Sequence, residues 1–108
     1  MKVDILGAKW TITLTDKTKD VGLLDSDGYC DPSSRLIVVN NAPDESLSNR
    51  QDWVKRNLRH EIIHAFLFES GIGFNFSGEC IGHSETMIDW MVIQFPKMLK
   101  VFKEVKCL

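Results

Sequence analysis

The chain has 108 residues, of which 44% are hydrophobic and 26% charged, and its net charge is −2 at neutral pH. These values are typical of one soluble globular domain over residues 1–108, and they exclude a collagen-like, low-complexity or disordered chain. The near-neutral charge argues against a dedicated nucleic-acid-binding protein, which is usually strongly basic.

The first forty residues favour β-strands. Residues 10–15 alternate with period two and are rich in β-branched side chains, whereas residues 3–6 are a weaker candidate. Residues 28–31 and 35–39 flank the turn signal Pro-Ser-Ser, so we expect them to pair as a hairpin. The pattern predicts a small antiparallel sheet of three or four strands.

A long helix is expected next. Residues 48–51 (Ser-Asn-Arg-Gln) have the form of a capping box, and neither glycine nor proline occurs from there until Gly71. Residues 62–68 are apolar on nearly every side of the helix, apart from His64. The sequence therefore predicts a helix that ends at Gly71 and lies at the centre of the domain.

The C-terminal part of the chain predicts two further helices. Residues 71–83 are rich in glycine and favour an irregular loop. Ser84 can cap a helix that extends to Phe95, and we expect Pro96 to end it and to begin another over residues 97–105. The expected fold class is α+β, with a small sheet packed on the long central helix.

Several features bear on the location of the protein. No apolar run approaches the ~20 residues that a membrane span needs, and residues 1–6 carry no apolar signal core. Cys30, Cys80 and Cys107 form neither a closed disulfide set nor a CxxC zinc pattern. We therefore expect a cytoplasmic protein with free thiols and no membrane partner.

The strongest chemical signal is the segment His60-Glu61-Ile62-Ile63-His64. Histidines at i and i+4 lie about 40° apart around a helix, so both imidazoles can reach one metal ion, and Zn²⁺ favours such ligands. Glu61 lies beside this face, where it can accept a proton from a metal-activated water. Because the flanks are apolar, an unpaired cluster there would carry a large desolvation penalty, which a metal ion removes.

A zinc site needs at least a third protein ligand. Position 67 is leucine, so the metzincin pattern HExxHxxGxxH is absent. Glu85 is the favoured ligand, with Asp89 one turn later as a carboxylate that holds a ligand histidine in its tautomer. His83, in the glycine-rich loop, is the alternative ligand.

Residues 58–71 together with residues 84–90 resemble the small phage and prophage zinc metallopeptidases of the gluzincin type. In gluzincins the HExxH helix is followed by a glutamate helix that bears E-x-x-x-D, which the second segment matches. The resemblance implies a zincin-like fold and zinc-dependent hydrolysis of peptide bonds. The roles that it implies are metal ligation by His60, His64 and Glu85, general base catalysis by Glu61, and support of the ligands by Asp89.

The resemblance also leaves one role open. Larger gluzincins carry a downstream histidine or tyrosine that stabilises the oxyanion, and the candidates in this chain are His83 and Tyr29. Cys80, in the loop before the glutamate helix, is a candidate for a thiol that blocks the metal, as in latent proteases.

The expected function is a zinc-dependent endopeptidase with a protein or peptide substrate, aligned by an edge strand over residues 36–39 or 10–15. One rival is a protease that clears a single repressor, resembling the ImmA/IrrE type. A second is an SprT-like protease that acts on DNA-bound proteins, with His83 replacing Glu85 as the ligand. The third is a non-catalytic zinc-binding protein of a mobile element.

Lysines and arginines occur in two runs. Those upstream of the HExxH motif can steer an acidic substrate, although solvation of an exposed helix start is the simpler interpretation: Arg50, Lys55, Arg56 and Arg59. The lysines of residues 97–106 are best explained as the solvated face of an amphipathic helix.

Overall fold

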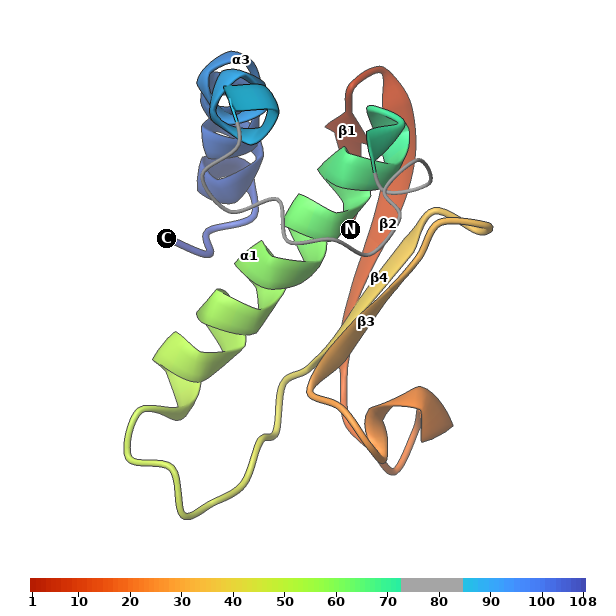
Figure 1. The fold of residues 1–108 in the computed structure, drawn as a ribbon. Helices are drawn as coiled ribbons and strands as arrows, with labels where there is room; N and C mark the ends of the chain where they lie inside the picture. The colour runs from red at the N-terminus through yellow and green to blue at the C-terminus, as the bar shows by residue number, and fades with distance from the viewer. Residues whose placement is uncertain (73–84) are drawn as a thin grey trace.

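The computed structural model describes residues 1–72 and 85–108, apart from the side chains of Glu85, Ile88, Asp89 and Val92. Its strands form one sheet in the order β1-β2-β4-β3, and α1 lies between this sheet and α3 (Figure 1). The α+β class is therefore as expected. The elements are β1 (Lys2–Ile5), β2 (Ala8–Thr15), the 3-10 helix η1 (Val21–Leu23), β3 (Gly28–Asp31), β4 (Leu36–Asn40), α1 (Arg50–Glu69) and α3 (Glu85–Glu104).

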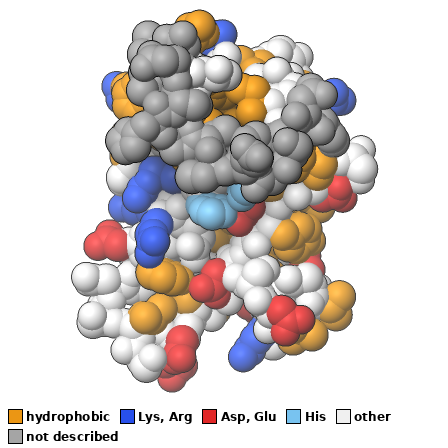
Figure 2. All heavy atoms as spheres, in the orientation of Figure 1, with side chains coloured by type: hydrophobic (Ala, Val, Ile, Leu, Met, Phe, Trp, Pro, Cys, Tyr) orange, Lys and Arg blue, Asp and Glu red, His pale blue; other side chains and the backbone are white. Residues whose placement is uncertain are grey.

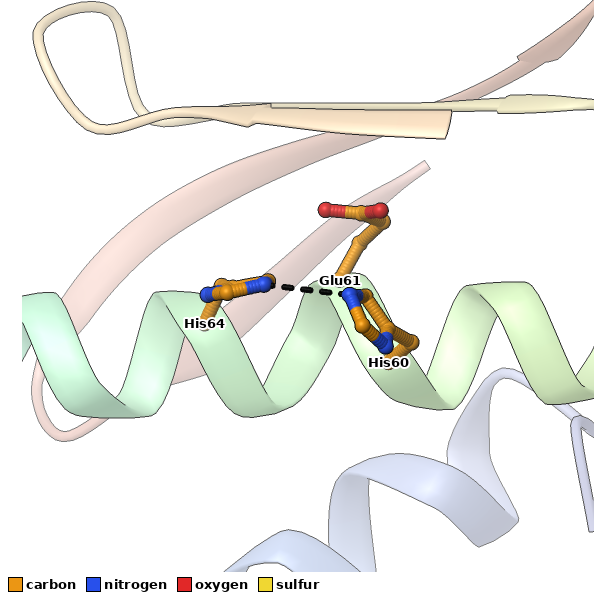
Figure 3. A group of neighbouring side chains, drawn as sticks. All are labelled: His60, Glu61 and His64. Carbon is orange, nitrogen blue, oxygen red and sulfur yellow. Dashed lines mark hydrogen bonds between the residues drawn. The ribbon is translucent and has the colours of Figure 1, made fainter. Parts of the chain in front are cut away.

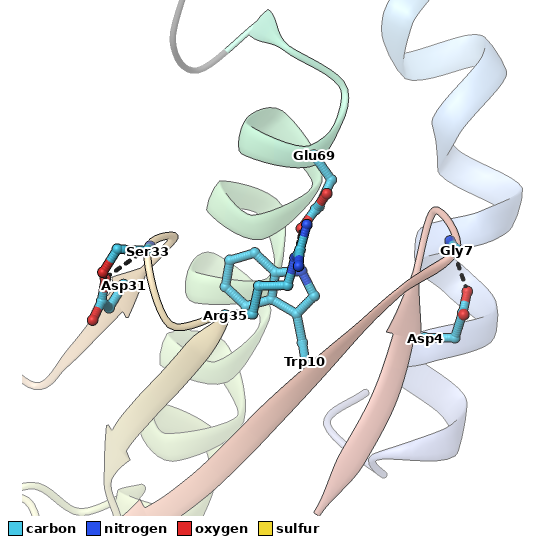
Figure 4. Close-up of polar contacts among 7 residues, drawn as sticks. All are labelled: Asp4, Gly7, Trp10, Asp31, Ser33, Arg35 and Glu69. Carbon is cyan, nitrogen blue, oxygen red and sulfur yellow. Dashed lines mark hydrogen bonds and ion pairs between the residues drawn. The ribbon is translucent and has the colours of Figure 1, made fainter.

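The four strands occur where the sequence pattern predicts them. The alternation of β2 buries Trp10 and Ile12 against α1, and the hairpin of β3 and β4 has the expected antiparallel pairing. The turn between β1 and β2 requires positive φ at residues 6 and 7, which have φ of 53° and 88°. The Asp4 carboxylate closes it by accepting the Gly7 N–H at 3.0 Å (Figure 4).

The expectation of an antiparallel sheet is wrong, because β2 and β4 are parallel and the sheet is mixed. The reason lies in the composition of β4, which is an almost continuous apolar run. Ile37 and Val39 face the core beside α1, while Val38, which pairs with Tyr29 on β3, is buried on the other face. Burial on both faces favours an internal position, and β4 lies between β2 and β3, which leaves β3 at the edge.

Helix α1 ends where predicted but begins differently. Gly71 follows the last turn with φ of 88°, and its N–H donates to the Phe68 carbonyl at 3.1 Å. The predicted capping box is not formed: Asn49 occupies the N-cap position without a side-chain hydrogen bond. With the helix starting at Arg50, Gln51 falls one position too early for the box. The buried residues of α1 are Leu58, Glu61, Ile62, Ala65 and Phe66.

The two expected C-terminal helices are one continuous helix, α3, with Pro96 inside it. An internal proline costs about 3 kcal/mol, whereas full burial of each large apolar side chain contributes about 1.5–3 kcal/mol. Met98, Val101 and Phe102, beyond the proline, are buried in the same core as Trp90 before it. An unbroken helix keeps these residues in phase. Over the described ranges, no helix is both long and apolar enough to cross a membrane.

Polar side chains fasten α1 to its neighbours. Glu69 accepts the Trp10 indole N–H at 2.8 Å and pairs with Arg35 at 2.6 Å, so one carboxylate joins β2, the start of β4 and the end of α1 (Figure 4). On the other side, Trp90 of α3 donates to the Ser70 hydroxyl at 3.1 Å. The orientation of α1 relative to both layers is therefore set by specific hydrogen bonds as well as by packing.

Replacement of Glu69 by alanine should destabilise the fold by about 1–3 kcal/mol, because it leaves the indole N–H of Trp10, a residue with no exposed area, without its acceptor. The hydrogen bond from Arg35 lowers the pKa of Glu69, and the one from Trp10 acts in the same direction. The ionised carboxylate therefore favours the folded state at neutral pH, and this contribution is lost as the pH falls through the lowered pKa.

Urea unfolding at neutral and progressively acidic pH measures both effects. Glu104→Ala, an exposed acid of α3, is the matched control and should leave stability unchanged. The difference in free energy of unfolding between wild type and Glu69→Ala should decrease on acidification. A difference that stays constant would contradict the role given to the ionised carboxylate.

Candidate metal centre

Two histidines of α1 lie with their ring nitrogens close together on the surface. His60 and His64 are both exposed, and their Nε2 atoms are 3.1 Å apart, with the rings edge to face (Figure 3). The helix brings them together because residues four apart lie one turn apart on the same face. The local sequence alone is therefore enough to create the pair.

The separation of the two nitrogens fits a shared metal ion. Zinc–nitrogen bonds of about 2.0–2.1 Å in tetrahedral geometry place two ligand nitrogens about 3.3 Å apart. The observed 3.1 Å is close to that value, and it also suits a hydrogen bond between the rings. Partial burial lowers the pKa of His64, and the charge of the neighbouring His60 lowers it further. A lowered pKa favours the neutral imidazole, which is the form that binds metals.

Glu61 extends from α1 towards the strands, beside the histidine pair (Figure 3). The Glu61 residue is only 8% exposed. Its carboxylate oxygen and one ring nitrogen from each histidine nevertheless all lie within 4.8 Å of one another. Burial raises the pKa of Glu61, and the nearby His60 opposes this shift. The arrangement places a carboxylate beside the two imidazoles, and no described residue donates a hydrogen bond to it.

Glycine at position 28 favours the close approach of β3 to Glu61. A Cβ atom added to Gly28 would lie 3.3 Å from both Cγ and Oε1 of Glu61 and 3.1 Å from the Val38 carbonyl oxygen. Glycine thus allows the edge strand to pass directly over the carboxylate. This role of Gly28 is not visible in the sequence, since a glycine at the start of a strand has no distinctive local pattern.

Cys30 lies two residues further along β3, on the same face as Gly28. Desolvation, with the charges of Glu61 and Asp31, raises the pKa of its thiol to about 12, so it is protonated at neutral pH. Cys30 and the buried Cys107 are free, as expected, and Cys80 lies outside the described residues. The thiol of Cys30 is therefore unsuited to compete for the metal as a thiolate.

Asn57, one turn before Glu61, was also missed. Its Nδ2 atom is buried and has no hydrogen-bond partner in the described structure. A buried donor without an acceptor costs about 1–3 kcal/mol. The spacing of four residues from Glu61 is the signal that sequence reasoning had available for it. This face of α1 therefore carries an amide whose hydrogen-bonding capacity is unused.

The other predicted site residues are only partly located. Glu85 is the first residue of α3, one turn before Asp89, but neither side chain is described; His83 lies outside the described residues, as does Ser84. Tyr29 donates its hydroxyl to Asp20 at 2.7 Å, and strand alternation puts it on the opposite face of β3 from Gly28. The structure therefore does not bring Tyr29 to the histidine pair.

The centre opens onto a surface of mixed charge. Figure 2 shows the histidines exposed between Asp and Glu side chains on one side and Lys and Arg side chains on the other. Within the described part of the chain, one cluster of residues has the donor atoms for a metal ion, namely His60, Glu61 and His64.

Comparison of the chain with protein-family models, with curated proteins and with solved structures found no match.

Substitution of His60 or His64 by alanine should weaken zinc binding by more than about 100-fold, which exceeds the 10–100-fold effects typical of residues that merely support a ligand. Both side chains are exposed, so the fold should be retained. Calorimetric titration with zinc, alongside circular dichroism, tests this. Wild-type affinity in either variant would remove that histidine from the centre.

The third ligand is tested by comparing Glu85→Ala with His83→Ala. We expect Glu85→Ala to lose zinc affinity and His83→Ala to retain it, because Glu85 lies at the start of the helix that packs against α1. The reverse result in the same titration would assign the ligand to His83, and normal binding by both variants would exclude both residues.

Proposed function

We propose that this chain is a zinc-dependent endopeptidase. The observation that carries the proposal is the pair of exposed imidazole nitrogens 3.1 Å apart beside a largely buried carboxylate. The resemblance of residues 58–71 and 84–90 to gluzincin-type phage metallopeptidases supports the same function and a zincin-like fold.

His60 and His64 would hold the ion through their Nε2 atoms, with Glu85 as the third ligand and Asp89 as a carboxylate that orients the ligands. The resemblance implies these two roles, and α3, which begins at Glu85, contacts the helix of the histidines. Zinc bound there would polarise a substrate carbonyl and lower the pKa of a coordinated water towards ~7.

Glu61 is the proposed general base. It accepts a proton from the attacking water and returns it to the departing amine, which converts the amine into a better leaving group. Burial on the β3 side favours this role, because a raised carboxyl pKa makes Glu61 a stronger proton acceptor. Its position one residue after His60 keeps it beside the metal face without making it a ligand.

The edge strand β3 is the proposed track for the substrate. Residues 36–39, one of the two segments predicted for this role, belong to β4, which pairs on both sides, so that prediction is wrong. Residues 10–15, the other segment, belong to β2, which lies between β1 and β4 and pairs with β1 over residues 8–11. By contrast, β3 is an edge strand, contacts α1 and passes over Glu61 at Gly28. An extended peptide that adds to β3 would therefore present its backbone beside the proposed base.

Glu61→Gln should retain zinc and fold but lower peptide hydrolysis by about 10²–10⁴-fold, the contribution expected of a general base. Metal analysis of the purified variant and cleavage of a fluorogenic peptide library, with and without a chelator, measure the two properties. Asp52→Asn, an exposed acid in the first turn of the same helix, is the control and should cleave as wild type does.

Two outcomes would contradict the proposal. Undiminished hydrolysis by Glu61→Gln would remove this carboxylate from the mechanism. A wild-type protein that binds zinc but cleaves no peptide of the library would favour the non-catalytic zinc-binding alternative.

A further inference from the structure

We infer that Arg56 recognises a carboxylate of the peptide substrate and so gives the enzyme a preference for acidic sequences. This inference rests on the proposed peptidase function. It begins from position: Arg56, His60 and His64 follow one another at intervals of four residues, and all three are exposed. They therefore form a single stripe along the solvent side of α1.

The arginine is held in place by an aromatic side chain. The Arg56 guanidinium carbon lies 4.9 Å from the centroid of the Trp53 ring, within the range of a cation–π contact. The indole N–H of Trp53 in turn donates to the Asp27 carboxylate at 2.9 Å. Since Asp27 directly precedes β3, this chain of contacts connects the arginine to the start of the proposed substrate strand.

The charge of Arg56 is not neutralised by a described residue. Arg35 pairs with Glu69, and Arg59 donates to the Cys107 carbonyl, but Arg56 has no ion-pair partner within 4.0 Å in the described ranges. The indole explains this, because it contacts Asp27 through its N–H and Arg56 through its face. Trp53 thus orients the guanidinium while holding it apart from the nearest strand carboxylate.

Distances along α1 and along a peptide bound to β3 predict which substrate side chain Arg56 contacts. Four helical residues from Arg56 to His60 span about 6 Å, which matches about two residues of an extended peptide. A substrate along β3 with its cleaved bond beside the histidines would therefore present to Arg56 a side chain about two residues from that bond. Guanidinium forms directional, charge-assisted hydrogen bonds with a carboxylate.

The surface beyond Trp53 restricts the position of that acid further. A hollow of about 760 Å³ in contact with Asp27 has a mostly acidic charged lining, in which Asp25, Asp44 and Glu45 outnumber Lys17. These carboxylates disfavour acidic groups further out along the same path. Arg56 is the cation on the histidine stripe, so it offers an aspartate or glutamate side chain of the substrate an attractive partner beside the centre.

The test measures peptide binding by zinc-loaded Glu61→Gln, in which peptides persist uncleaved. Fluorescein-labelled peptides carry one glutamate at successive positions, with a neutral set for comparison, and each set is made with a free or an amidated C-terminus. Arg56→Gln is added to the Glu61→Gln background, and Arg50→Gln, an exposed cation on the same helix but off the stripe, is the matched control. Zinc content verifies that every variant is loaded.

We expect Arg56→Gln to weaken binding about three- to tenfold, relative to the Glu61→Gln background, for peptides whose glutamate lies at one or two adjacent positions. Neutral peptides should bind with little change, and Arg50→Gln should have little effect on any peptide. A loss confined to peptides with a free C-terminus would identify the terminal carboxylate as the recognised group and would overturn the preference for acidic sequences.

Equal losses in Arg50→Gln and Arg56→Gln would indicate general charge steering and overturn the role of Arg56. Cleavage by wild-type protein without any acidic preference in binding would also overturn it, while leaving the proposed function intact. Failure of the wild-type protein to bind or cleave any peptide would instead overturn both.

Discussion

The architecture depends on one helix that is packed on most of its circumference yet must leave a single stripe in contact with water. The sheet and α3 cover opposite sides of α1, and its buried residues include the apolar Leu58, Ile62 and Phe66. Polar contacts at Glu69 and Ser70 hold its C-terminal end in register with both layers. Any rotation of α1 about its axis would bury the imidazoles of the centre or expose the core, so packing and chemistry constrain the helix together.

Local patterns predict the elements of this fold better than their arrangement. The period of β2 and the spacing of α1 are properties of short segments, and both are confirmed. The order of the strands depends on which faces become covered, and the apolar run of β4 was the available sign that it lies inside the sheet. Pro96 was misjudged because its local cost is visible in the sequence, whereas the core contacts of the following residues come from tertiary packing.

The same division applies to the candidate centre. His60, Glu61 and His64 come together through helix geometry alone, so the sequence predicts their grouping. Gly28 and Asn57 acquire their significance only from the approach of β3 to α1, which no local pattern encodes. The roles of Glu85, Asp89 and His83 stay predictions.

The unpaired edge of β3, beside the candidate centre, also bears on self-association of the protein. In the described structure no strand pairs with the outer side of β3, so its backbone groups are as available to a second copy as to a peptide. Native proteins limit such self-association by keeping edge strands short and by placing charge and proline at their ends. β3 has four residues, ends at Asp31 and is followed by Pro32, so it has these safeguards against aggregation.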